Sequence, residues 1–189
     1  MNSTKITKEI ANLVEKTCKK KSNYYGYGAW SHHIVSVVKY AKILAKKLKA
    51  DEEVIEIAAL LHDYASVLDK KLYPQHHIHG ARLAGEILTK YKYPKAKIEI
   101  IKKCILNHRA SIKRKRASIE EKIIASADSM AHFDNVDSLL QLAYVIHKMG
   151  IDEGTKWVLE KLERSYKKLI PEAKEIIEKK YKAIQKALE

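Results

Sequence analysis

Histidine and aspartate side chains are concentrated in one part of this sequence, beside apolar helical segments. Eight of the nine histidines lie between residues 32 and 132. The segment AALLHD, residues 58–63, ends an apolar helical face in the adjacent imidazole and carboxylate of His62 and Asp63. Burying either group alone is unfavourable, because each loses its hydration. The pair therefore predicts a partner that stabilises both groups.

A divalent metal ion is the partner that these residue types favour. Imidazole nitrogen and carboxylate oxygen together form a donor set for transition metals. This donor set suits manganese, iron, zinc, nickel or cobalt. Metal-capable side chains from five predicted helices lie at helix ends or on apolar edges, where one end of a bundle could bring them together: His33, His62, Asp63, His79, His108 and Asp128.

The composition predicts a single all-α domain, a helical bundle over residues 1–189. Hydrophobic residues make up 46% of the chain and charged residues 32%, a balance typical of globular proteins. Lys, Glu, Ile, Leu and Ala dominate the sequence and favour helix, and 189 residues suffice for one domain with a sizeable core. We expect the metal-binding core at about residues 30–140, with C-terminal helices at 151–188 packing on it.

Polar residues before apolar periodic segments predict where helices begin. Ser31, Asp51, Ser118 and Asp137 are expected N-caps, and Ser118 with Glu121 forms an expected capping box. The periodicity of apolar residues predicts helices at about 4–20, 32–48, 52–65, 75–91, 95–108, 119–133, 138–149, 151–169 and 172–188.

Five segments in this order give the sequence a resemblance to a known family. They are HIVSVVKYA from His33, AALLHD with His62 and Asp63, HGARLAGEIL from His79, CILNHRAS with His108, and IIASADSMAHFDN with Asp128. Over roughly residues 30–140 the chain resembles the HD-domain superfamily of metal-dependent phosphohydrolases, most closely the small stand-alone members.

The resemblance implies a helical bundle, a metal site and hydrolysis of a phosphate ester or anhydride. It assigns the metal to His33, His62, Asp63 and Asp128. We expect one or two divalent ions, with manganese favoured over iron, nickel, cobalt, zinc and magnesium. Asp63 would both ligate the metal and orient the attacking water. His79 and His108 have two alternative roles: they bind a second metal, or they contact the substrate phosphate and protonate the leaving oxygen.

Other histidines receive weaker roles. His76 and His77 lie at the start of a predicted helix, and we prefer a surface position for them to the alternative of a role in the pocket. His132 follows Asp128 by one helical turn and is expected to support it from behind.

The sequence departs from the family pattern at one phosphate-binding position. Many members read HD-I-G-K, and this chain has Ser66 in place of that lysine. Lys70 or Arg109 is expected to substitute, together with Arg114 from the basic segment RASIKRKRAS. The loop 24–30, rich in Tyr and Gly, forms either a lid or stacking surface over the site or, as we prefer, an ordinary packed connection.

The main functional prediction is a metal-dependent phosphohydrolase: a phosphomonoesterase, phosphodiesterase or pyrophosphohydrolase acting on a nucleotide or a related small phosphate compound. The net charge of +14 raises the alternative of a nucleic-acid-binding or RNA-processing protein, which we do not favour. A non-catalytic, metal-stabilised module is the third alternative. No apolar segment reaches the length of a membrane span, and Cys18 and Cys104 are isolated. We therefore expect a cytoplasmic protein without a membrane partner, and a homo-oligomer is left open.

Overall fold

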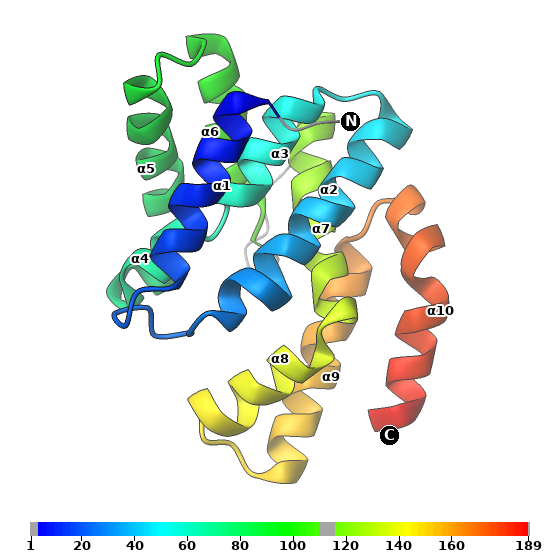
Figure 1. Ribbon diagram of the computed structural model, residues 1–189. Coiled ribbons are helices and arrows are strands. Elements are labelled where there is room, and N and C mark those ends of the chain that lie inside the picture. The colour runs from blue at the N-terminus through cyan, green and yellow to red at the C-terminus, as the bar shows by residue number, and fades with distance from the viewer. Residues whose placement is uncertain (1–3, 110–115, 189) are drawn as a thin grey trace.

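All regular elements of residues 4–109 and 116–188, the part of the chain that the computed structural model describes, are helical (Figure 1). The prediction of an all-α fold is confirmed. In chain order the elements are α1 (Lys5–Cys18), the π-helix η1 (Ala29–Ile34), α2 (Val35–Leu48), α3 (Glu52–Leu61), α4 (Tyr64–Leu68), the 3-10 helix η2 (Lys70–Gln75), α5 (His76–Lys90), α6 (Lys95–Asn107), α7 (Ile119–Asp134), α8 (Val136–Gln141), the π-helix η3 (Leu142–Ile146), α9 (Ile151–Lys168) and α10 (Pro171–Leu188).

Two of the four expected N-caps are present. The Asp51 side chain accepts a hydrogen bond from the Val54 amide, 3.1 Å away, at the start of α3. The Ser118 hydroxyl accepts from the Glu121 amide at 3.2 Å at the start of α7. The capping box is only half formed, because the Glu121 carboxylate accepts from the Ala117 amide instead of the Ser118 amide.

The other two cap predictions are wrong. The π-helix η1 already begins at Ala29, since the Ala29 amide bonds to the Gly26 carbonyl and the preceding turn runs directly into the helix. Ser31 therefore lies inside the helix and not at its cap. Helix α8 begins at Val136, so Asp137 is also a helical residue, and its carboxylate accepts from the neighbouring Ser138 amide.

Helices α3 and α7 form the centre of the fold. Seven of the ten residues of α3 are buried, and so is nearly all of α7 from residue 121 to residue 131. A helix that is apolar around its whole circumference is stable only when other helices surround it. Helices α2, α6, α9 and α10 pack on α7, and α1, α2 and α6 pack on α3 (Figure 1). The metal-capable side chains emerge from the ends and edges of this buried pair.

The two C-terminal helices are attached to α7 by aromatic and ionic contacts. The Phe133 ring packs edge-on against Tyr181 at 5.4 Å, and Tyr166 stacks on Tyr181 at 4.2 Å. The Asp134 carboxylate accepts from the Tyr40 hydroxyl at 2.6 Å and pairs with Lys180 of α10. These contacts place α9 against the helix that carries Asp128.

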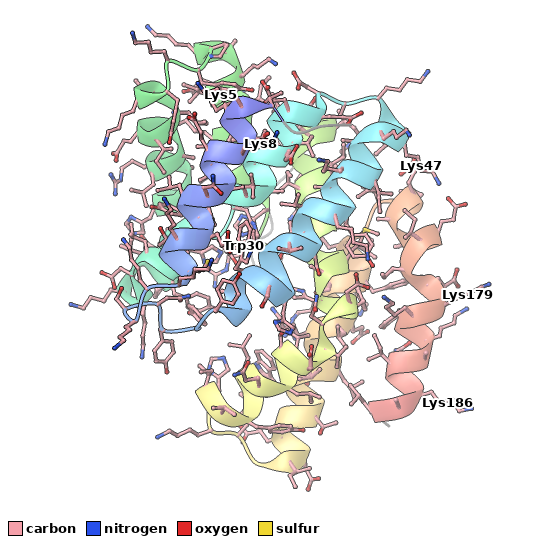
Figure 2. All side chains as sticks on the ribbon, in the orientation of Figure 1. Lys5, Lys8, Trp30, Lys47, Lys179 and Lys186 are labelled. Carbon is pink, nitrogen blue, oxygen red and sulfur yellow. The ribbon has the colours of Figure 1, made fainter. Side chains whose placement is uncertain are left out.

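Exposed lysines lie on several separate helices. Figure 2 labels Lys5 and Lys8 on α1, Lys47 on α2, and Lys179 and Lys186 on α10, and all five are exposed. These charges fit an ordinary solvated surface. None of the helices in the described ranges combines the length and the apolar character that a membrane span requires.

Gly154 on α9 is a position where the packing should not tolerate a side chain. A Cβ atom there would collide with the Tyr144 ring of η3, whose hydroxyl is bonded to Thr155 at 2.7 Å. We expect Gly154→Ala to lower the melting temperature, because overpacking costs about 1–3 kcal/mol and better helix propensity returns only about 1 kcal/mol. Gly150→Ala, with nothing within 4 Å of the added methyl group, is the control. An unchanged melting temperature for Gly154→Ala would contradict this packing.

Candidate metal centre

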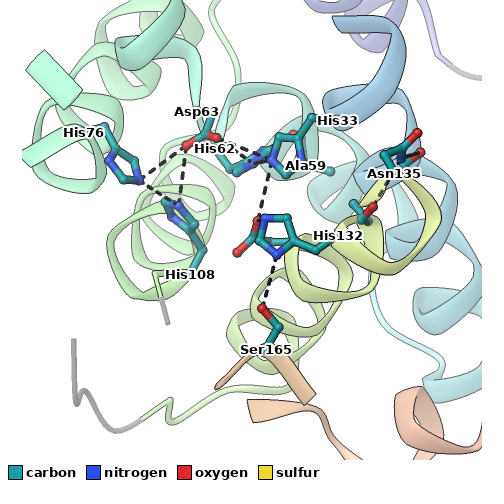
Figure 3. Close-up of polar contacts among 12 residues, drawn as sticks. His33, Ala59, His62, Asp63, His76, His108, His132, Asn135 and Ser165 are labelled. Carbon is teal, nitrogen blue, oxygen red and sulfur yellow. Dashed lines mark hydrogen bonds and ion pairs between the residues drawn. The ribbon is translucent and has the colours of Figure 1, made fainter. Parts of the chain in front are cut away.

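Histidine and aspartate side chains from five parts of the chain come close together beside the ends of α3 and α6 (Figure 3). His62 and Asp63 lie directly after the last residue of α3, and His108 directly after the last residue of α6. The remaining three come from other elements: His33 from η1, His76 from the first position of α5, and Asp128 from the middle of α7.

The side chains form two groups, and Asp63 links them. Each group has its ligand atoms within 4.8 Å of one another; one comprises His33, His62 and Asp128, and the other comprises Asp63, His76 and His108. One oxygen of Asp63, Oδ2, lies 3.5 Å from His33 Nε2 and 3.4 Å from His62 Nε2. The other, Oδ1, lies 3.4 Å from His76 Nε2 and 3.7 Å from His108 Nε2. A carboxylate with one oxygen toward each group is placed to bridge two ions.

Backbone carbonyls fix the orientation of three of these imidazole rings. The Nδ1 atoms of His62, His76 and His108 lie 2.7, 2.7 and 2.6 Å from the carbonyl oxygens of Ala59, Tyr73 and Ile105. A carbonyl oxygen only accepts hydrogen bonds, so each Nδ1 donates a proton. In the neutral ring, Nε2 then presents a lone pair to the centre. A metal-binding histidine commonly has this arrangement of its second nitrogen.

The Nε2 atoms face each other in pairs. His33 Nε2 lies 3.1 Å from His62 Nε2, and His76 Nε2 lies 3.2 Å from His108 Nε2. Two lone pairs at this distance repel unless a proton or a cation lies between them. The donor set of imidazole nitrogens and carboxylate oxygens fits a divalent transition-metal ion in each group.

The charge states of the buried groups follow from burial and from their neighbours. Burial alone lowers the pKa of His62, but the adjacent Asp63 carboxylate outweighs it and raises that pKa to about 9. Burial raises the pKa of Asp63 and of Asp128, but nearby imidazoles and, for Asp128, the Lys168 ammonium hold both well below their usual range. Burial and the charge on His62 lower the pKa of His108 to about 3. At neutral pH, His62 therefore carries a proton while His108 is neutral.

Metal binding should release the proton of His62. Its folded-state pKa is raised, so below about pH 9 the proton must leave before Nε2 can bind a metal. We expect the apparent affinity for Mn²⁺ to rise about tenfold per pH unit between pH 7 and pH 8. Calorimetric titration in buffers of different ionisation enthalpy measures both the affinity and the protons released. An affinity that does not change with pH would contradict this assignment.

The structure places His76, and not His79, beside His108. His76, Gly80, Ala84 and Leu88 are all buried and follow one another at four-residue intervals, which puts His76 on the buried face of α5. His79 lies about 4.5 Å further along the helix axis, is half-buried and belongs to neither ligand group of the described residues.

The expectation that His76 and His77 lie at the surface is wrong, because both are buried. The four-residue stripe of small and apolar residues was the signal in the sequence that could have identified His76.

Two of the three basic residues expected to bind phosphate have contact partners outside the two ligand groups. The Lys70 ammonium sits 3.6 Å above the centre of the Tyr24 ring. The Arg109 guanidinium donates to the Pro74 carbonyl at 2.6 Å. Arg114 lies outside the described residues. The role of these three residues in binding phosphate remains a prediction.

Two lysines of α9 were missed by sequence reasoning. Lys168 Nζ lies 3.2 Å from Asp128 Oδ2 and donates to the His108 carbonyl at 3.1 Å, and only 6% of its side chain is exposed. Lys161 lies two helical turns earlier on the same face and lines a pocket beside the centre. Ser165, buried between them, marks that face as one that packs on the body of the protein. A lysine on the buried face of an amphipathic helix is the signal that the sequence offers.

His132 lies behind the first ligand group, as expected from its spacing. Its ring stacks on His33 with centroids 5.5 Å apart, and its Nε2 is 4.0 Å from Asp128 Oδ1. Its Nδ1 is 3.2 Å from the Ser165 hydroxyl of α9. His132 thus connects the centre to α9.

A pocket of about 160 Å³ opens beside the centre. Asp63 and His33 line it, and both π-helices contribute to the lining, with Leu142 and Ile146 coming from η3. Irregular helical turns of this type occur frequently at functional sites. Polar and aromatic side chains complete the lining, among them Tyr25, Tyr73, Ser66, Gln141 and Lys161. The pocket can therefore hold an organic group next to an anion.

Comparison with known proteins places this centre in a family. The HD domain family model matches residues 30–132, a segment that includes all six residues of the two ligand groups. The chain is 35% identical over 79 residues to an uncharacterized protein of Clostridium beijerinckii, a match covering 41% of this chain and 50% of that protein. The chain thus spans about half the length of the curated relative that it matches.

Two solved structures share the fold. Bacillus subtilis YpgQ, solved in complex with ADP, aligns with a TM-score of 0.72 and 17% identity over 96% of this chain and 93% of that chain. A protein described as a predicted HD superfamily hydrolase, from an uncultured Thermotogales bacterium, aligns with a TM-score of 0.58 and 23% identity over 82% of this chain and 84% of that chain. Similarity at these identities shows a common fold that extends beyond the matched family segment.

Proposed function

Because the chain belongs to the HD-domain family, whose members are in general metal-dependent hydrolases, we propose that it is a metal-dependent phosphohydrolase acting on a nucleotide or a related small phosphate compound. The observation that carries this proposal is the pair of facing Nε2 contacts, His33 with His62 and His76 with His108, with Asp63 between them. Such a donor set fits two divalent cations, and two-metal sites are common in enzymes that cleave phosphate esters.

Each residue of the centre has a definite task in this proposal. His33, His62 and Asp128 would hold one ion, His76 and His108 the other, and Asp63 would contact both. A bound divalent ion lowers the pKa of a water molecule and neutralises charge on a phosphoryl group. Lys168 holds Asp128 Oδ2, which leaves Oδ1 facing His33 at 3.6 Å. The carbonyl contacts keep the imidazole lone pairs directed at the centre.

The pocket supports a substrate that combines an organic group with phosphate. Tyr25 and Tyr73 offer aromatic surface, Leu142 and Ile146 offer apolar surface, and Lys161 supplies a positive charge. Aromatic side chains stack on nucleobases. The ADP complex of Bacillus subtilis YpgQ shows a nucleotide bound by a protein of this fold. A nucleotide is therefore the substrate class that we propose for this chain.

Product analysis tests the proposal. The protein, loaded with Mn²⁺, is incubated with nucleoside mono-, di- and triphosphates, cyclic nucleotides and sugar phosphates, and the products are identified by mass spectrometry. Turnover of one class is expected. Binding of metal without turnover of any of these compounds would contradict the proposal. Binding of RNA or DNA at two salt concentrations would then test the nucleic-acid alternative, because contacts to phosphates give a steep salt dependence.

A further inference from the structure

Two lysines of α9 approach the centre, and only one of them is engaged by a protein carboxylate. Lys168 is paired with Asp128 and also donates to the His108 carbonyl. Lys161 lines the pocket together with Asp63 and His33, and no carboxylate of the described residues forms an ion pair with its ammonium. The Trp157 ring of the same helix has its centroid 5.8 Å from Lys161 Nζ. Lys161 therefore presents a positive charge to the pocket.

This charge lacks a counter-ion once metal is bound. Burial lowers the pKa of Lys161, while Asp128 and Asp63 act from a distance to keep it charged, and Arg164 and Arg109 add further positive charge around it. Divalent ions at the centre would neutralise the two aspartates. An enclosed ammonium is then stabilised only by an anion that enters the pocket.

A second polar group of the pocket also lacks a partner. The Ser66 hydroxyl is buried, lines the same pocket and has no hydrogen-bond partner among the described residues. Ser66 occupies the position at which the sequence departs from the HD-I-G-K pattern. A hydroxyl donor and an ammonium donor in one pocket are together suited to the oxygens of a phosphate group.

We propose that Lys161 binds a second phosphate group of the substrate, one that is not attacked at the centre, and so makes the protein prefer nucleoside diphosphates and triphosphates to monophosphates. The inference rests on the proposed function and specifies its substrate class. Lys161 lies outside the matched HD-domain segment, residues 30–132. The preference for diphosphates and triphosphates would thus come from α9 and not from the residues that bind the metal.

Binding of ADP and AMP to the Mn²⁺-loaded protein, measured by calorimetry, tests this role. We expect Lys161→Met to weaken ADP binding by about tenfold or more, because a charge-assisted contact is lost, and to change AMP binding much less. Lys161→Arg, which keeps the charge, should bind ADP nearly as wild type does. Lys156→Met, at an exposed position of the same helix, is the matched control and should change neither affinity.

Three results would overturn the inference: equal weakening of ADP and AMP binding by Lys161→Met, no weakening of ADP binding, or no ADP binding by the wild-type protein. Failure of the proposed function is distinguishable from these. ADP binding that depends on Lys161, without turnover of any phosphate compound, would support the role of Lys161 and contradict the phosphohydrolase. Turnover, together with an ADP affinity that Lys161→Met does not change, would support the phosphohydrolase and contradict the role of Lys161.

Discussion

Asp63→Asn is expected to abolish metal-dependent turnover, lowering kcat by on the order of 10³-fold. Asparagine has nearly the same shape as aspartate but carries no charge, so the substitution removes the negative charge and keeps the side-chain volume. Asp63 is the residue with the most contacts in the centre: its two oxygens lie 3.4 to 3.7 Å from the Nε2 atoms of four histidines. An amide can present only one oxygen, so it cannot contact both ligand groups as a carboxylate does.

The same substitution should also weaken metal binding and change the protonation of the site. The Asp63 carboxylate is the main group that raises the pKa of His62 against the effect of burial, so we expect that pKa to fall in the variant. Metal affinity is expected to fall at least tenfold despite the easier loss of that proton, because a ligand charge is lost. Asp152→Asn, at an exposed position of α9, is the control. Wild-type turnover and metal content in Asp63→Asn would exclude the proposed centre.

His76→Ala should be far more harmful than His79→Ala, although the two residues lie one helical turn apart. His76 Nε2 lies 3.2 Å from His108 Nε2 and 3.4 Å from Asp63 Oδ1. Its loss removes one of the three ligands of the second group, and we expect turnover to fall by about 10²-fold or more. His79 is half-buried and belongs to neither group, so His79→Ala should retain nearly all of the turnover.

Comparing these two variants distinguishes His76, the residue that the structure places in the second ligand group, from His79, the residue that the sequence pattern predicted. Metal content per chain, measured by elemental analysis, and kcat/KM give independent readings of each variant. The second group should lose its ion in His76→Ala alone. Equal losses in the two variants, or a larger loss in His79→Ala, would show that the sequence pattern identified the functional histidine and that the structure did not.

Local signals predicted the helices well because each depends on neighbouring residues. Asp51 and Ser118 cap their helices because an oxygen two or three residues before an unpaired amide is enough to form the bond. Ser31 has the same residue type, but the Ala29 amide already bonds to the Gly26 carbonyl, so the helix has begun before Ser31. A cap prediction from residue type cannot detect this earlier start, since the start of the helix depends on the conformation of the preceding loop.

The candidate centre was predicted in part because three of its members, His62, Asp63 and His108, follow apolar helical segments directly. AALLHD and CILNH each continue the apolar face of a helix, so the sequence places His62 and His108 at buried helix ends. His76 begins a helix instead, and only the burial of Gly80 and Ala84 behind it shows its direction. The sequence places Lys161 and Lys168 on the buried face of an amphipathic helix, but their position beside the centre depends on how α9 packs against α7.

Anomalous diffraction from crystals of the wild-type protein soaked in Mn²⁺ would test directly whether each ligand group holds a metal ion. Data recorded above and below the manganese absorption edge locate each ion without reference to activity. We expect one ion bonded to His33, His62 and Asp128, a second bonded to His76 and His108, and Asp63 in contact with both. Absence of ordered manganese from these residues, or manganese bound only elsewhere on the protein, would contradict this expectation.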